Sequence, residues 1–142
     1  MSKHSDDAWI FVSIGDAKGL NGWAPLRDVI GAADSRNHAI PSIAELEGAV
    51  SRLVAAGLVE SRGTETRLTA AGAKAFKDAE RPRAGHIERM FRLGQEWDRA
   101  DFPPDAPISW SLTESDWEAA YGEYHSWAQR VIARMTRDIP RR

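Results

Sequence analysis

One helix signal constrains the fold more than any other part of the sequence. Ser42, followed three residues later by Glu45, forms a capping box that predicts a helix from Ile43 to Ala56. Gly57 is placed to end that helix in the left-handed conformation. Apolar side chains recur within the helix at a spacing that puts them on one side: Ile43, Leu46, Val50, Leu53 and Val54. The sequence therefore predicts a helix with one buried face and one outward edge.

A short hairpin is predicted directly after this helix. Val59 to Arg62 and Glu65 to Leu68 are strand candidates on either side of Gly63-Thr64. Glycine at the first of two loop residues favours a type II′ turn. The remaining periodic segments are helical, so the expected fold class is mainly α with a small two-stranded β-hairpin.

Five further helices and one domain boundary complete the expected organisation. Asp34 to His38 is interpreted as a turn, and Arg81-Pro82-Arg83 interrupts the periodicity. We therefore expect a domain over residues 5–79, a linker at 80–83 and a helical extension over 84–139. The five helices are predicted from Ser5, used as a cap, to about Ala17; from Pro25 in a first turn; after Thr69; from Ala84 to Ala100; and from Thr113 to Asp138.

The composition of the 142 residues excludes several classes of protein. There is no Cys, so neither a disulfide framework nor a thiolate metal site is available. The longest strongly apolar run, Ala8 to Val12, is far shorter than the roughly 18 residues that span a bilayer. The first residues, 1–7, have no apolar core typical of a signal peptide. We therefore expect a cytoplasmic protein that does not enter a membrane.

The order of three helices, a hairpin and a further helix over residues 5–79 resembles a winged helix-turn-helix domain. The string Glu45-Leu46-Glu47-Gly48-Ala49-Val50-Ser51-Arg52-Leu53-Val54-Ala55-Ala56-Gly57-Leu58-Val59-Glu60 is similar to the third helix and first wing strand of MarR- or PadR-type regulators. Leu68-Thr69-Ala70-Ala71-Gly72 is similar to the Leu-Thr-x-x-Gly that often follows the wing there. The resemblance implies a third helix in the DNA major groove, a wing on the adjacent backbone, and dimerisation through outer helices.

The leading hypothesis is accordingly a non-enzymatic transcriptional regulator that binds double-stranded DNA. Ser51 and Arg52 lie on the outer edge of the third helix, where hydrogen-bonding side chains would contact bases. The candidate DNA-binding residues are Arg36, His38, Ser51, Arg52, Arg62, Thr64 and Arg67. For the residues before the helix and in the wing, an ordinary role in turns or in solubility is an equally good interpretation.

The alternative hypothesis is a winged helix that contacts a protein and does not bind DNA. The formal net charge of −2 and the acidic Glu45 favour it, because phosphates repel both. The small residues Ala44, Gly48 and Ala55 would pack on a partner or on the C-terminal helices. Both hypotheses use the outward edge of the helix after Ser42, and a C-terminal arm lying across that edge would remove the docking surface.

The last predicted helix carries the clearest apolar stripe of the sequence. Three interpretations are open: packing within the chain, a two-fold contact between copies, or a ligand pocket with Arg89 or Arg92 at its mouth. The candidate dimer or interface residues are Trp117, Tyr121, Tyr124, Val131 and Met135. A homodimer through the C-terminal helices is therefore expected alongside DNA or a protein partner.

Catalysis is not indicated by any motif. The four His residues have no paired helical spacing, so we expect no zinc site. No phosphate-binding glycine loop or nucleophile elbow is present. The expectation is a protein without catalytic residues, metal or cofactor.

Overall fold

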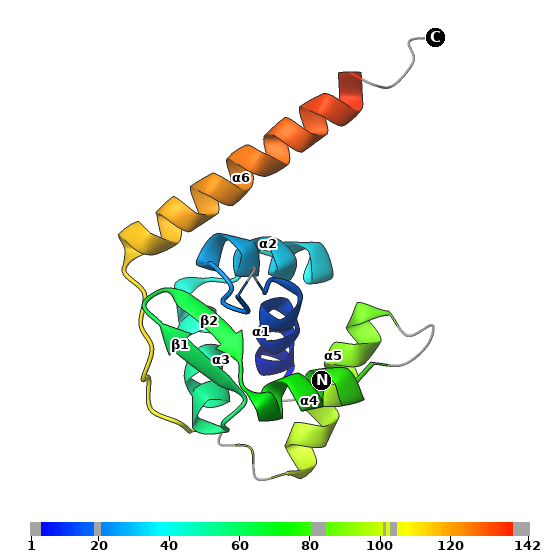
Figure 1. The fold of residues 1–142 in the computed structure, drawn as a ribbon, viewed down its shortest axis with the longest axis vertical. Helices are drawn as coiled ribbons and strands as arrows, with labels where there is room; N and C mark the ends of the chain where they lie inside the picture. The colour runs from blue at the N-terminus through cyan, green and yellow to red at the C-terminus, as the bar shows by residue number, and fades with distance from the viewer. Residues whose placement is uncertain (1–3, 19–20, 81–84, 101, 103–104, 138–142) are drawn as a thin grey trace.

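The structure is a computed structural model that describes residues 4–18, 21–80, 85–100, 102 and 105–137. Within those residues it contains six helices and one antiparallel hairpin, which confirms the predicted class of mainly α with a small hairpin (Figure 1). The elements are α1 (Ser5–Asp16), α2 (Leu26–Asn37), α3 (Ile43–Ala55), β1 (Val59–Arg62), β2 (Glu65–Leu68), α4 (Ala70–Asp78), α5 (His86–Arg99) and α6 (Glu114–Arg137). Apart from Glu80, the predicted linker lies outside the described residues.

Helix α1 occupies the centre of the molecule. Every residue from Asp7 to Gly15 is buried, because α2, α3, α4 and α5 all contact this helix (Figure 1). Its sequence is apolar on nearly all sides, as expected of a helix that is surrounded rather than amphipathic. Two of its polar groups are satisfied by backbone oxygens: Trp9 Nε1 donates to Ala33 O at 3.0 Å and Ser13 Oγ donates to Trp9 O at 2.7 Å.

Helix α3 and the hairpin follow the sequence signals closely. The Ser42 hydroxyl accepts from Glu45 N at 3.1 Å, and the Glu45 carboxylate accepts from Ser42 N at 3.0 Å, which completes the capping box. Gly57 has a φ of 76°, as predicted for the end of the helix. Gly63 has a φ of 58° at the first of the two loop positions, as a type II′ turn requires.

A third extended segment joins the hairpin without being predicted. Ala24, just before α2, forms an isolated antiparallel bridge with Thr66 of β2. Ala24 N donates to Thr66 O at 2.7 Å, and Thr66 N donates to Ala24 O at 3.2 Å. A single bridge leaves almost no periodic signal in the sequence. It fixes the loop between α1 and α2 to the hairpin.

Three expected helix boundaries are wrong. The predicted turn over residues 34–38 is the last part of α2, and only His38, with a φ of 52°, leaves the helix in the left-handed conformation. Pro25 has an extended conformation at the N-cap instead of lying in the first turn. At the start of α1 the capping position belongs to His4 instead of Ser5, and it makes no side-chain capping bond. Ser5 and Pro25 each lie one position from the expected place, which is the ordinary scatter of helix ends, whereas α2 continues through Asp34–Asn37.

Helix α5 packs on α1 and shares its core. Met90, Leu93 and Trp97 are buried in the same apolar cluster as the side chains of α1. The Trp97 ring stacks on Phe102 with centroids 4.8 Å apart. Ile87 and Phe91 of the same helix do not join this packing, and both side chains are more than half exposed.

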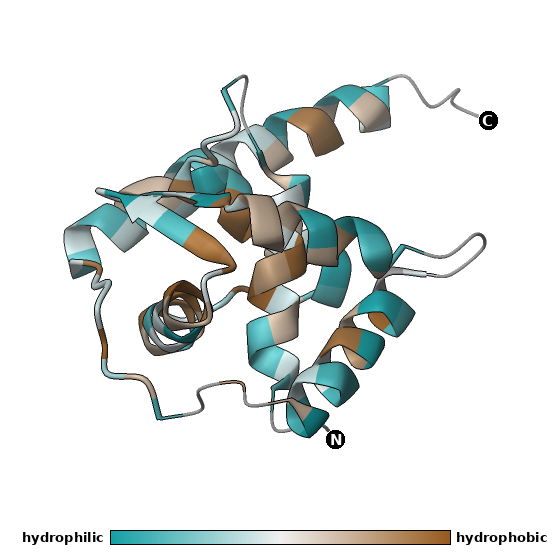
Figure 2. Ribbon diagram, turned by 60° about the horizontal axis from the view of Figure 1, so that its bottom comes forward, coloured by the Kyte–Doolittle hydropathy of each residue, from teal (hydrophilic) through white to brown (hydrophobic). Residues whose placement is uncertain are grey.

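Helix α6 extends away from the body of the molecule. Its first turns lie on α2, and its last turns project into solvent, as Figure 1 shows. The Tyr124 ring lies so close to Gly31 of α2 that a Cβ at that glycine would be 2.9 Å from it. Apolar segments of α6 continue into the projecting part (Figure 2). No helix among the described residues is both long enough and apolar enough to cross a bilayer.

Candidate functional site

The outward edge of α3 is covered by the segment between α5 and α6. We call residues 105–113 the strap; it runs from the start of α6 past α3 (Figure 1). Ser51 is only 1% exposed, and its Oγ accepts from Ser109 N at 3.0 Å and from Trp110 N at 3.3 Å. The expectation that Ser51 faces outward, available to a base, is therefore wrong.

Further bonds fix the strap to α3 and to the tip of the hairpin. Leu112 N donates to Glu47 Oε2 at 2.7 Å, and Trp110 Nε1 donates to Gly63 O at 2.9 Å. The side chains of Trp110 and Leu112 are buried. Because the strap belongs to no helix or sheet, its backbone donors take their partners from side chains of α3. The strap thus occupies the part of the outer edge around Ser51 and Glu47, whereas Ala44 and Ala55 on the same helix remain exposed.

Arg52 is also committed to a contact inside the chain. Its Nε donates to the Asp7 carboxylate at 2.8 Å, and Asp7 is almost fully buried, with His4 Nδ1 at 3.1 Å from its other oxygen. A Cβ at Gly48 would lie 3.1 Å from the Arg52 guanidinium, so the small residue leaves room for this side chain to fold back. The expected role of Arg52 toward guanine is not available in this arrangement.

The start of α3 faces a concentration of carboxylates. Burial raises the pKa of Asp6, and the nearby charges of Glu45 and Asp7 raise it further, while Arg52 acts in the opposite direction. A raised carboxyl pKa records an environment unfavourable to further negative charge. The larger cause is burial and does not act on a phosphate in solvent, whereas a phosphate near this end of α3 would also meet the repulsion from Glu45 and Asp7. The sequence does not single out Asp7, because its partner Arg52 is 45 residues away.

Arg62 and Arg67 lie together on the outer face of the hairpin. Arg62 pairs with Glu65 at 3.0 Å, and Arg67 pairs with Glu60 at 2.8 Å. Both guanidinium groups also lie over the Trp23 ring, at 4.4 and 4.3 Å from its centroid. Each cation is therefore matched by a carboxylate across the strands, although both side chains keep substantial exposure. Thr64, at the turn, is half-buried.

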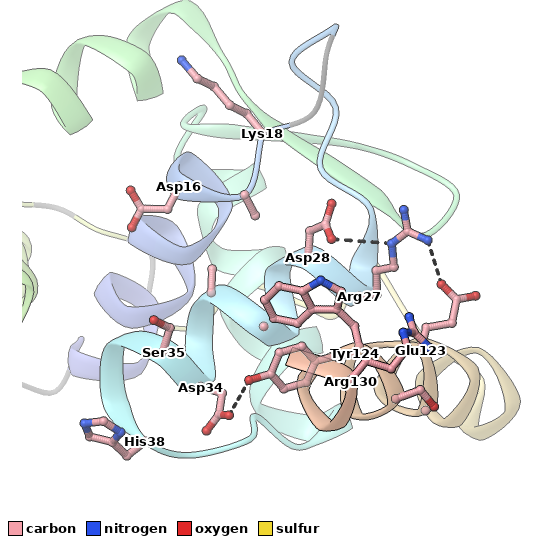
Figure 3. A pocket seen from close by; sticks show the side chains of 16 residues that line it. Asp16, Lys18, Arg27, Asp28, Asp34, Ser35, His38, Glu123, Tyr124 and Arg130 are labelled. Atoms are coloured by element: carbon pink, nitrogen blue, oxygen red, sulfur yellow. Dashed lines mark hydrogen bonds and ion pairs between the residues drawn. The ribbon is translucent and has the colours of Figure 1, made fainter. Parts of the chain in front are cut away.

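The two candidates before α3 lie in a different part of the molecule. Arg36 Nε donates to Asp16 at 2.7 Å and ties the end of α2 to the end of α1. His38 lines a cleft between α2 and α6 (Figure 3). The structure thus separates the predicted DNA-binding residues into an occupied helix edge, a hairpin and the end of α2.

The cleft between α2 and α6 was not predicted. It has a volume of about 1330 Å³ and opens beside the projecting part of α6. Arg27 bridges Asp28 and Glu123 along one side, and the Tyr124 hydroxyl donates to Asp34 at 2.6 Å (Figure 3). Burial, followed by this hydrogen bond to Asp34, raises the pKa of Tyr124 to about 12. The lining mixes acids, bases and aromatic rings.

The candidate interface residues of α6 divide into two groups. Trp117, Tyr121 and Tyr124 are half-buried by packing within the chain, with Trp117 Nε1 donating to Pro41 O at 3.1 Å. Packing within the chain covers these three side chains only in part, so their assignment to a contact between copies stays a prediction. Val131 is half-buried, and Met135 is 63% exposed. The exposed apolar surface also includes Trp127 at 55% and Ile132 at 57%.

No known protein supplies a function for this arrangement. No family description, curated protein or solved structure matches the chain. Within the described residues, no three side chains of His, Asp or Glu come together in a way that could hold a metal ion. The surfaces that the chain itself covers and those that it leaves exposed are therefore the evidence that bears on function.

Proposed function

We propose that the chain is a protein-interaction module without catalytic activity, and that its contact surface is the projecting part of α6. One observation carries the proposal. The apolar stripe that packs α6 on α2 continues along the same helix past the cleft, which Trp127 lines, and Trp127, Ile132 and Met135 are each more than half exposed. Large apolar side chains gathered on one solvent-facing stretch are typical of an interaction surface.

The body that carries this helix is proposed to be a winged helix. The order of α1, α2, α3 and hairpin supports this, as does the bridge from Ala24 to Thr66, which adds a short third segment to the hairpin. In this proposal α3 has a structural role, because Ser51 and Glu47 bind the strap and not an external partner. The acidic surroundings of α3 and the net charge of −2 are further support for a protein partner over DNA.

Replacement of the three exposed apolar side chains tests whether they serve an external contact. A W127S/I132S/M135S variant should keep the thermal unfolding midpoint of the wild type at high dilution, within about 2 °C, because exposed substitutions change stability little. Circular dichroism measures this midpoint. A large loss of stability in dilute solution would assign the stripe to the core and overturn the proposal.

The hairpin favours DNA binding as a second candidate function. Arg62 and Arg67 keep exposed guanidinium groups on one face, so a duplex could contact the wing if the strap left α3. Fluorescence anisotropy with a duplex at low salt distinguishes the two candidates. The interaction-module proposal expects no binding, whereas a DNA-binding protein would weaken with salt at a log–log slope near −0.9 per phosphate contacted. In that case an R62A/R67A variant would reduce the slope by up to about two.

A further inference from the structure

The apolar stripe of α6 is used along only half of its length. Toward the N-terminus the stripe meets α2, where Ala120 is buried and Tyr124 lies against Gly31. Toward the C-terminus the same face has passed the end of the body, so Met135 and its neighbours remain exposed. The surface best suited to this second half is therefore one that resembles the first, namely another copy of α2.

The charges of α6 are separated along its length. Every acidic residue of the helix precedes every basic residue: Glu114, Asp116, Glu118 and Glu123 come first, and Arg130, Arg134 and Arg137 follow. Four of these charges, at positions 116, 123, 130 and 137, recur every seven residues and so share one flank of the helix. Their signs are minus, minus, plus, plus. Two such helices are complementary when they lie antiparallel and self-repelling when they lie parallel.

We propose that the partner of α6 is a second copy of this chain, bound with the two α6 helices antiparallel across a two-fold axis. This inference rests on the proposed interaction function. The axis passes near the bond between Ser126 and Trp127, because positions 123 and 130 are equally distant from it, as are 116 and 137. Glu123, which pairs with Arg27 of its own chain at 2.9 Å, then also faces Arg130 of the partner subunit, and by symmetry Arg130 faces the partner subunit's Glu123.

The cleft between α2 and α6 is where the partner helix lies. Its opening is beside α6, it is lined by Glu123 and Arg130 from that helix, and small residues of α2, Gly31 and Ala32, form part of its wall (Figure 3). In this arrangement the C-terminal half of each α6 lies over α2 of the partner subunit. The N-terminal half of the same α6 stays on α2 of its own chain. Burial of the exposed stripe supplies the affinity, and the flanking charges set the orientation.

Cysteine cross-linking tests the arrangement directly, because the chain contains no Cys of its own. Under mild oxidation an E123C/R130C variant should form a covalent dimer in which position 123 of each copy is linked to position 130 of the other. Within one helix these positions are about 10 Å apart along the axis, too far for a disulfide, which needs Cα atoms within about 7 Å. E123C alone and R130C alone should remain non-covalent. Dimers from either single variant would indicate parallel helices and overturn the proposal.

Charge exchange measured by sedimentation velocity provides a second test on the full chain. E123R and R130E should each weaken self-association about tenfold or more, because each places like charges at two symmetric sites. E123R/R130E restores both pairs between the copies but not the pair of Glu123 with Arg27 of its own chain, so it should associate more tightly than either single variant. Wild-type protein that is monomeric at every concentration, or single reversals without effect, would overturn the inference. The proposed function would fail differently, through duplex binding or through unfolding of the dilute W127S/I132S/M135S variant.

Discussion

Helices α3 and α6 are both amphipathic, but the chain covers part of the outer surface of α3 and leaves part of the apolar stripe of α6 exposed. On α3 the outer edge is occupied by the strap, which hydrogen bonds to Ser51 and Glu47 and buries Trp110. On α6 the second half of the apolar stripe is largely exposed to solvent. There Trp127 is 55% exposed, Ile132 57% and Met135 63%. A surface already occupied within a chain is a poor candidate for function, however well its sequence matches a motif. We therefore propose a contact surface on α6 and not on α3.

The largest effect is expected at the anchor between α3 and α1. Replacement of Asp7 by Ala should destabilise the fold by about 3–5 kcal/mol, because Arg52 would lose the buried carboxylate that compensates its charge. Urea unfolding followed by circular dichroism measures the change. D105A, at an exposed position of the strap, is the control and should change stability by less than about 0.5 kcal/mol. Equal effects would mean that α3 is not held by this pair.

The same substitution at two tryptophans compares the strap and α6 directly. W110A should cost about 3 kcal/mol, since it removes a buried ring and its hydrogen bond to Gly63. W127A should cost less than about 1 kcal/mol in dilute protein, because its ring is more than half exposed. Thermal unfolding at low concentration gives both values. If W127A were the more damaging of the two, the contrast between occupied and available surfaces would be wrong.

Local signals account for what could be predicted from the sequence. The capping box at Ser42, the left-handed Gly57 and the turn at Gly63 depend on residues within a few positions of one another. The cover on α3 depends on contacts across 58 and 65 residues, from Ser51 to Ser109 and from Glu47 to Leu112. No periodicity carries such information.

The sequence does not show which half of the α6 stripe is packed, and the reason is related. The stripe has the same period along the whole helix, so the sequence cannot show where the body beneath it ends. Tyr124 and Met135 belong to the same stripe. Tyr124 lies over α2 at Gly31, whereas the side chain of Met135 is 63% exposed. The candidate interface residues were consequently chosen partly from the half that is already packed.

A smaller effect is expected from the hydroxyl that holds the strap. S51A should cost about 1–2 kcal/mol, because Ser109 N and Trp110 N lose the oxygen to which they donate. S126A, at an exposed position of α6, is the matched control and should be close to neutral. Urea unfolding measures both variants. A neutral S51A would show that water replaces the hydroxyl and that the strap is held by its side chains alone.

The contact between α6 and α2 should appear in the alkaline titration of the two tyrosines. Tyr124 has a raised pKa of about 12, so its neutral form is favoured in the folded state. Its stabilising contribution is therefore complete below the unfolded value near 10 and is lost as the pH rises from about 10 to 12. Absorbance near 295 nm should show a step near pH 12 that is absent in Y124F. Retention of that step in Y124F would contradict its assignment to Tyr124.

The smallest effect on stability is expected at Ile132, an apolar side chain that is exposed to solvent. I132S should change the stability of dilute protein by less than about 0.5 kcal/mol, since Ile132 is 57% exposed. The corresponding substitution in the buried part of α3, L53S, should cost several kcal/mol because Leu53 is fully buried. The size of the I132S effect should rise with protein concentration, because at high concentration the side chain becomes part of an interface between copies. Unfolding curves at two concentrations a hundredfold apart measure this rise, and an effect independent of concentration would contradict a role for Ile132 in association.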